Sequence, residues 1–138
     1  MLNEAQKFAE KLDVDFSQDL TNEHNRFFTG THKFPLEDVW YTKGFVGQKK
    51  PRFVPSVYFL DEFLSKSPRV AVINKKSAWL FLCGRDVLED SIISITHKSG
   101  SIIVKDENGV CLGIARIERD ILKNTFDKGW LLRREFSR

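Results

Sequence analysis

KKSAWLFLCGRDVL, residues 75–88, is the stretch from which the fold of this chain can be inferred. Asn74 precedes it and is a residue type that caps helix starts. Gly84 suits the left-handed position that follows a helix. These signals predict a helix over 75–82. Its apolar spacing predicts four side chains facing inward: Ala78, Trp79, Phe81 and Leu82.

The residues on both sides of this helix are typical of strands. Asp106-Glu107-Asn108-Gly109 predicts a tight hairpin turn, because Asn-Gly tolerates positive φ. Alternating or apolar runs predict strands at 69–73, 92–96, 102–105, 110–117 and about 129–136. One helix among several strands with tight turns predicts a small closed or half-closed β-barrel with the helix plugging its side.

The first half of the chain has a different pattern. Apolar spacing predicts a short helix over 3–12, capped by Asn3, and a second helix over 57–65, capped by Ser56. A short strand is predicted around 39–42. The polar connector at about 66–69, ending the second helix at Pro68, indicates a boundary. We therefore predict an α+β protein with a small α/β domain at 1–67 and a second domain at 68–138.

Composition limits the class of protein. The chain has 138 residues, 41% hydrophobic and 30% charged, which is enough to bury a core in one ordinary domain or two small ones. The longest apolar run, Trp79–Cys83, is too short to cross a bilayer, and the first residues predict no secretory signal. Cys83 and Cys111 lack a disulfide or metal spacing. We expect two buried thiols in a protein of the reducing cytoplasm.

The net charge of +3 is unevenly distributed. Residues 1–23 carry two bases against six acids, residues 43–52 carry four bases, and residues 123–138 carry five bases against two acids. The middle basic segment is typical of a solvated surface. Arg133 and Arg134 lie in the predicted last strand, where rigid guanidinium groups would suit phosphate.

Motifs for catalysis are missing from the sequence. His24, His32 and His97 have no metal-ligand spacing, and the chain lacks GxSxG, GxGxxG and GxxxxGK[ST] motifs. We therefore expect a non-enzyme without catalytic residues, metal, cofactor or small-molecule substrate. Lys75 and Lys76 begin the predicted helix, where free N–H groups and the dipole favour phosphate. The alternative is that these two lysines only solvate the first helical turn.

The stretch at 75–88, the run Leu112-Gly113-Ile114-Ala115-Arg116-Ile117 and the segment 127–135 together resemble a PUA domain over about residues 69–136. Within such proteins the chain resembles the Nip-seven family of large-subunit ribosome biogenesis factors. The likeness rests on the Asp-x-Gly-x-x-x-Arg-x-Glu pattern that begins at Asp127, and on Arg52-Phe53-Val54 and residues 60–64. Within that family the chain resembles the archaeal form, with a shortened N-terminal domain.

This resemblance implies a C-terminal PUA-type β pseudo-barrel that binds RNA without catalysis. The implied function is a cytoplasmic adaptor in rRNA processing, which contacts pre-rRNA or a tRNA-like RNA and other ribosome assembly proteins. Trp130 could stack on a base or belong to the core. The expected RNA-binding residues are Lys75, Lys76, Gly84, Arg85, Leu88, Leu132, Arg133, Arg134 and Arg138.

An alternative function is a protein–protein adaptor whose acidic N-terminal half docks on a partner, with RNA contact incidental. Its surface would be the exposed part of a phenylalanine set comprising Phe8, Phe16, Phe27 and Phe28.

Overall fold

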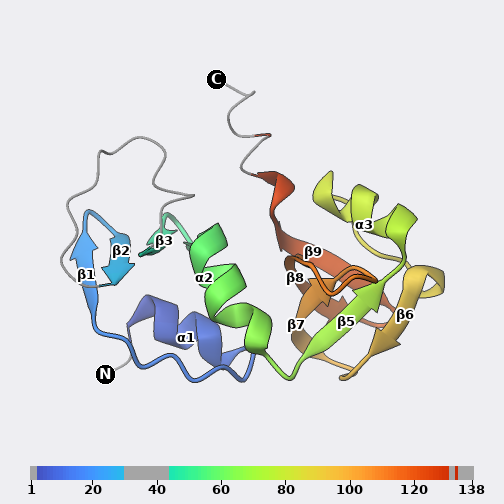
Figure 1. The fold of residues 1–138 in the computed structure, drawn as a ribbon, viewed down its shortest axis with the longest axis horizontal. Helices are drawn as coiled ribbons and strands as arrows, with labels where there is room; N and C mark the ends of the chain where they lie inside the picture. The colour runs from blue at the N-terminus through green and yellow to red at the C-terminus, as the bar shows by residue number, and fades with distance from the viewer. Residues whose placement is uncertain (1–2, 30–43, 131–132, 134–138) are drawn as a thin grey trace. The chain divides into compact units, whose positions relative to one another are not determined.

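A computed structural model describes residues 3–29, 44–130 and 133 of the chain (Figure 1). The chain divides into two compact units, Met1–Lys66 and Ser67–Arg138. Each unit is described by itself below. The predicted strand around 39–42, together with Leu132, Arg134 and Arg138, lies outside the described residues.

The first unit is built on an antiparallel sheet with the strand order β1-β2-β3-β4. The helix α1 contacts β4, and α2 contacts β3. Its elements are α1 (Glu4–Glu10), β1 (Leu20–Glu23), β2 (Arg26–Thr29), β3 (Phe45–Lys49), β4 (Phe53–Pro55), α2 (Val57–Glu62) and the 3-10 helix η2 (Leu64–Lys66).

Both predicted helix caps of this unit are confirmed. The Asn3 side chain accepts a hydrogen bond from the Gln6 backbone N–H at 2.8 Å, and the Gln6 side chain accepts one from the Asn3 N–H at 3.0 Å. Ser56 Oγ accepts from the Phe59 N–H at 3.0 Å and donates to the Phe45 carbonyl. Ser56 therefore ties the start of α2 to β3 as well as capping the helix.

The phenylalanines of the first unit form its core. The Phe16 ring lies 4.7 Å from Phe59 and 4.8 Å from Phe63, measured between ring centroids. Phe16, Phe27 and Phe28 are all buried, and the Phe8 ring packs on Phe53 at 5.2 Å. Three of the four phenylalanines named above as a possible docking surface are thus core residues and Phe8 is half-buried, because aromatic side chains supply most of the apolar area that this small unit can bury.

Part of the middle basic segment is neutralised locally. The Lys49 ammonium on β3 lies 3.2 Å from a carboxylate oxygen of Glu4 on α1. Lys50 and Arg52 remain exposed in the turn that leads to β4. This arrangement agrees with the interpretation of the segment as a solvated surface.

The second unit contains a five-stranded sheet with the order β6-β5-β7-β8-β9. The strands β5 and β7 are parallel, and the other neighbouring pairs are antiparallel. Its elements are β5 (Val70–Ile73), α3 (Lys75–Leu82), the 3-10 helix η3 (Glu89–Ser91), β6 (Ile92–Ile95), β7 (Gly100–Lys105), β8 (Cys111–Glu118) and β9 (Ile121–Asp127). The first four predicted strands and the Asp106–Gly109 turn are confirmed, with Gly109 at φ +82°.

The segment after α3 connects the two edges of this sheet. Val87 pairs with Leu122 on β9, which is one edge strand. The chain then passes through η3 and forms β6, the opposite edge, beginning at Ile92. Among the described residues the strand ladder does not close, so the sheet corresponds to the half-closed one of the two predicted barrel forms, with the loop after α3 linking its two edges. The α+β class is confirmed.

The helix α3 packs on this sheet through one face only. Ala78 and Phe81 are buried and Leu82 is half-buried. Trp79, which was also predicted to face inward, is 68% exposed. A helix turns about 100° per residue, so Trp79 lies nearly opposite Phe81. The core of the unit comprises Ala71, Ile73, Ala78, Phe81, Val87, Ile102, Val104, Leu112, Ala115 and Leu122.

The predicted last strand over 129–136 is wrong at the three residues of that segment that the structure describes. The final described strand, β9, ends at Asp127, and Gly129, Trp130 and Arg133 are helical. The strand lies earlier because Arg119, at φ +57°, turns the chain so that Leu122 and Phe126 are buried against β8.

The two cysteines, both expected to be buried, have different outcomes. Cys111 is buried as expected, whereas Cys83 is exposed because it follows the last residue of α3 on the side away from Phe81. In the described part of the chain, every helix is too short or too polar to pass through a bilayer.

We expect the two caps Ser56 and Asn74 to differ in their contribution to stability. Asn74 Oδ1 accepts one hydrogen bond, from the Ser77 N–H at 2.8 Å, so Asn74→Ala should lower the free energy of unfolding by about 1 kcal/mol. Ser56→Ala also leaves the buried Phe45 carbonyl without its hydroxyl donor, and should cost about 2–3 kcal/mol. Urea denaturation of both variants measures the difference, and equal losses would contradict it.

Candidate functional site

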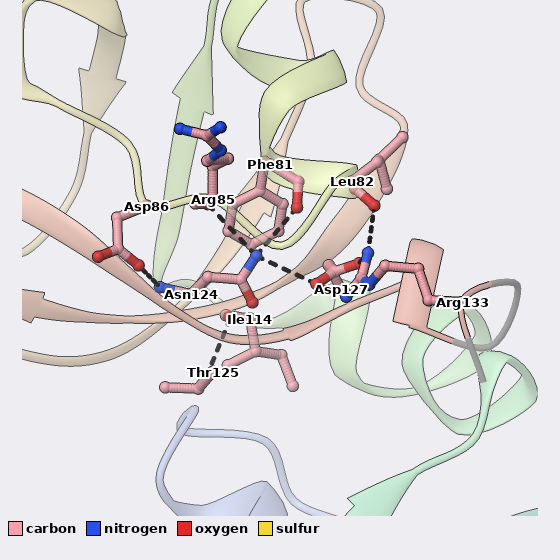
Figure 2. A network of polar contacts seen from close by, with 9 residues as sticks. All are labelled: Phe81, Leu82, Arg85, Asp86, Ile114, Asn124, Thr125, Asp127 and Arg133. Carbon is pink, nitrogen blue, oxygen red and sulfur yellow. Dashed lines mark hydrogen bonds and ion pairs between the residues drawn. The ribbon is translucent and has the colours of Figure 1, made fainter. Parts of the chain in front are cut away.

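A buried carboxylate lies where α3, β9 and the residues after β9 meet. Asp127 is only 2% exposed. Its two oxygens accept hydrogen bonds from Nη1 and Nη2 of Arg133, each at 3.0 Å (Figure 2). Asn124 Nδ2 donates a third bond to Asp127 Oδ2 at 3.1 Å. A buried charge needs a partner of this kind, so the pair fixes Arg133 onto the end of β9.

Asn124 connects this pair to the loop after α3. Its Nδ2 donates to the Phe81 carbonyl at 2.9 Å and to the Arg85 carbonyl at 3.3 Å. Its backbone N–H donates to Asp86 Oδ1 at 2.8 Å. The loop is therefore held on β9 from both its backbone and its side chain, as Figure 2 shows.

Arg133 also completes the end of α3. Its Nη1 donates to the Leu82 carbonyl at 2.6 Å, which is one of the carbonyls left without a helical partner. Gly129 permits this approach, since a Cβ there would overlap the same carbonyl oxygen. The hydrogen bond to Asp127 raises the pKa of Arg133, with burial opposing the shift. The stability that follows from a raised pKa is lost only when pH rises through it, so Arg133 keeps its charge at neutral and acidic pH.

The predicted RNA-binding lysines occupy the other end of α3. Lys75 and Lys76 form its first turn and both are exposed. The length of the helix places them about 10 Å along its axis from Leu82, from its rise of about 1.5 Å per residue. The first turn of α3 and the Arg133 network thus lie at opposite ends of the same helix.

The remaining described candidates lie on the loop. Gly84 has φ +93°, confirming its predicted position after the helix, and a Cβ there would lie 3.3 Å from Arg133 Nη2. The Arg85 carbonyl joins the Asn124 network, whereas its guanidinium group points away from it (Figure 2). Leu88 is 66% exposed.

The structure changes the interpretation of Arg133. Sequence reasoning placed it on a strand as a free phosphate ligand, but it is helical and its guanidinium fork is occupied by Asp127 and Leu82. The Arg133 side chain as a whole is 42% exposed. Arg133 therefore positions the end of α3, and a phosphate contact by it stays a prediction.

Two functional residues were missed by sequence reasoning, Asn124 and Asp127. Asn124 interrupts the apolar alternation of β9 between Leu122 and Phe126, and Asp127 directly follows Phe126. That interruption was the available signal. Within the described ranges, His, Cys, Asp and Glu form no group of three or more that could hold a metal ion.

We expect unequal effects from removing either partner of the Asp127–Arg133 pair. Arg133→Met leaves a buried carboxylate without its cation and should lower the free energy of unfolding by about 1–3 kcal/mol. Asp127→Asn leaves an arginine that water can still solvate, and should cost less. Urea denaturation at pH 7 compares the two, and a larger loss for Asp127→Asn would contradict this assignment.

Comparison with known proteins identifies the second unit. Residues 69–136 match the UPF0113 PUA domain. The fold of the chain is similar to that of a conserved PUA domain protein from Thermoplasma acidophilum, with a TM-score of 0.57, 17% identity and coverage of 95% of this chain and 93% of that one. No curated protein matches the chain. The second unit, with its five-stranded sheet and with α3 and its loop anchored on β9, therefore contains a UPF0113 PUA domain.

Proposed function

We propose that this protein is a non-catalytic RNA-binding protein that contacts RNA through its PUA domain. The observation that carries the proposal is the PUA domain at residues 69–136, whose α3 presents two exposed lysines. PUA domains typically bind RNA. The catalytic motifs that an enzyme would need are missing from the sequence, which supports a binding role.

The charge on α3 supports RNA as the ligand. Lys75, Lys76 and Arg85 are all exposed, and α3 itself contains no acidic residue. Cations at the start of a helix are opposed by its dipole, so a role in stabilising α3 does not explain the two lysines. Contact with phosphate groups does explain them.

The finer proposal is an adaptor in large-subunit ribosome biogenesis that binds pre-rRNA in the cytoplasm, together with other assembly proteins. It rests on the resemblance to the Nip-seven family. Two residues of the Asp-x-Gly-x-x-x-Arg-x-Glu pattern, Asp127 and Arg133, form the ion pair at the centre of the site. Gly129 of the same pattern makes the close approach to Leu82.

The protein–protein alternative placed its surface on the exposed part of Phe8, Phe16, Phe27 and Phe28. Three of these side chains are buried in the first unit and Phe8 is half-buried. Little of the set is therefore exposed for docking, which favours RNA binding by the second unit.

We expect Lys75→Gln/Lys76→Gln to weaken binding to a single-stranded RNA oligonucleotide. Each lost phosphate contact lowers the salt slope of the affinity by about 0.7, so the pair should lower it by roughly 1.4. Fluorescence anisotropy with a labelled RNA at several salt concentrations measures both quantities. The variant Lys11→Gln/Lys98→Gln is the matched control, because it removes the same charge from exposed positions outside α3.

Equal effects of the two double variants would show that only net charge matters and would contradict the site on α3. A full-length protein that binds no RNA at low salt would contradict the proposed function itself.

The ribosomal role predicts where the protein binds in cells. Crosslinking followed by sequencing of the bound RNA should enrich precursors of the large-subunit rRNA, and Lys75→Gln/Lys76→Gln should reduce that enrichment. Enrichment of tRNA or of small-subunit precursors instead would contradict the large-subunit assignment while leaving RNA binding intact.

A further inference from the structure

Trp79 has an unusual position for its residue type. Its side chain is 68% exposed in the middle of α3, whereas tryptophan is on average largely buried in folded proteins. The helix needs no tryptophan there, because Ala78 and Phe81 already fill its buried face. Exposing this much apolar surface is unfavourable in water, so a ligand that covers the ring would gain binding energy.

The neighbours of Trp79 one turn toward the start of α3 are cations. Lys75 and Lys76 precede it by four and three residues, the spacings at which side chains on a helix are adjacent. Arg85 follows in the exposed loop. The exposed face of α3, formed by Lys75, Lys76, Trp79 and Leu80, therefore combines a flat aromatic ring with positive charge about one helical turn away.

A single-stranded nucleic acid complements this face. An unpaired base offers a flat apolar surface that stacks on tryptophan, and its adjoining phosphates carry the charge that the lysines need. A base inside a duplex already stacks on its neighbours and leaves no face free for the ring. An acidic peptide would satisfy the lysines without using the aromatic plane.

We propose that Trp79 is a stacking platform for an unpaired RNA base, with Lys75 and Lys76 holding the flanking phosphates. This inference rests on the proposed RNA-binding function and adds the class of RNA, a single-stranded segment. It also gives the exposed tryptophan a role distinct from that of the lysines, since the ring contributes through the base and the lysines through phosphate.

The test uses the full chain with Trp79 as its only tryptophan, made by the substitutions Trp40→Phe and Trp130→Phe. A single-stranded RNA oligonucleotide should quench the Trp79 emission, because stacking brings the base against the indole. A duplex RNA of the same length should quench it less at equal occupancy. Equal quenching by both, or none by the single strand at saturation, would overturn the proposal.

The affinity measurement is an independent readout. Trp79→Ala should weaken single-stranded RNA binding by roughly five- to a hundredfold, the range for loss of one stacked base. It should leave the salt slope unchanged, because no phosphate contact is lost. Trp79→Phe should retain part of the affinity. Ile95→Ala is the control, since Ile95 is an apolar side chain, 40% exposed, on β6 opposite Ala71 near the start of β5.

The outcomes separate this inference from the proposed function. If Lys75→Gln/Lys76→Gln weakens RNA binding while Trp79→Ala does not, the stacking role is overturned and RNA binding stands. If Trp79→Ala keeps its RNA affinity but loses binding to a purified assembly protein, the face belongs to a protein partner. A protein that binds no RNA at all overturns both. Urea denaturation should show unchanged stability for Trp79→Ala, because the ring is exposed.

Discussion

A carboxylate that is buried away from water needs a cation beside it, and in this PUA domain the buried carboxylate is Asp127 and the cation is Arg133. Its oxygens receive both NH groups of the Arg133 fork and the Asn124 amide. Arg133 and Asn124 also donate hydrogen bonds to carbonyls at the end of α3 and in its loop. The side chains that bind Asp127 therefore hold β9, the end of α3 and the loop together. The position of α3 on the sheet follows from this constraint together with the packing of Ala78 and Phe81.

The two ends of α3 consequently differ in character. The end at Leu82 is anchored by hydrogen bonds to residues distant in the sequence, and the nearby glycines make room for the arginine. The end at Lys75 is capped by Asn74, whose own N–H donates to the Ser91 carbonyl at 3.0 Å, and it carries exposed cations and an exposed aromatic ring. A helix held at both ends is suited to presenting side chains to a ligand, because their positions are set before binding.

Local signals in the sequence were sufficient for most elements. The caps Asn3, Ser56 and Asn74, the turn at Asp106–Gly109 and the strand at 69–73 are encoded within a few neighbouring residues, and each was predicted correctly. The errors concern features that depend on distant contacts. Trp79 was predicted to face inward because its side chain is apolar. It lies on the exposed side of α3, because the sheet contacts the side that carries Ala78 and Phe81. Arg133 resembled a strand residue because the buried Asp127 that recruits it was not recognised as its partner.

The hydrogen bond from Arg133 to the Leu82 carbonyl joins residues 51 positions apart. During synthesis the whole of α3 therefore exists well before the residue that fixes its last turn. Chain elongation at about 5–20 residues per second separates the two events by several seconds. A nascent chain that has not yet reached residue 133 holds Asp127 without its cation, so the last turn of α3 gains its final anchor late in translation. The order of synthesis thus delays the fully anchored helix until most of the domain has been made.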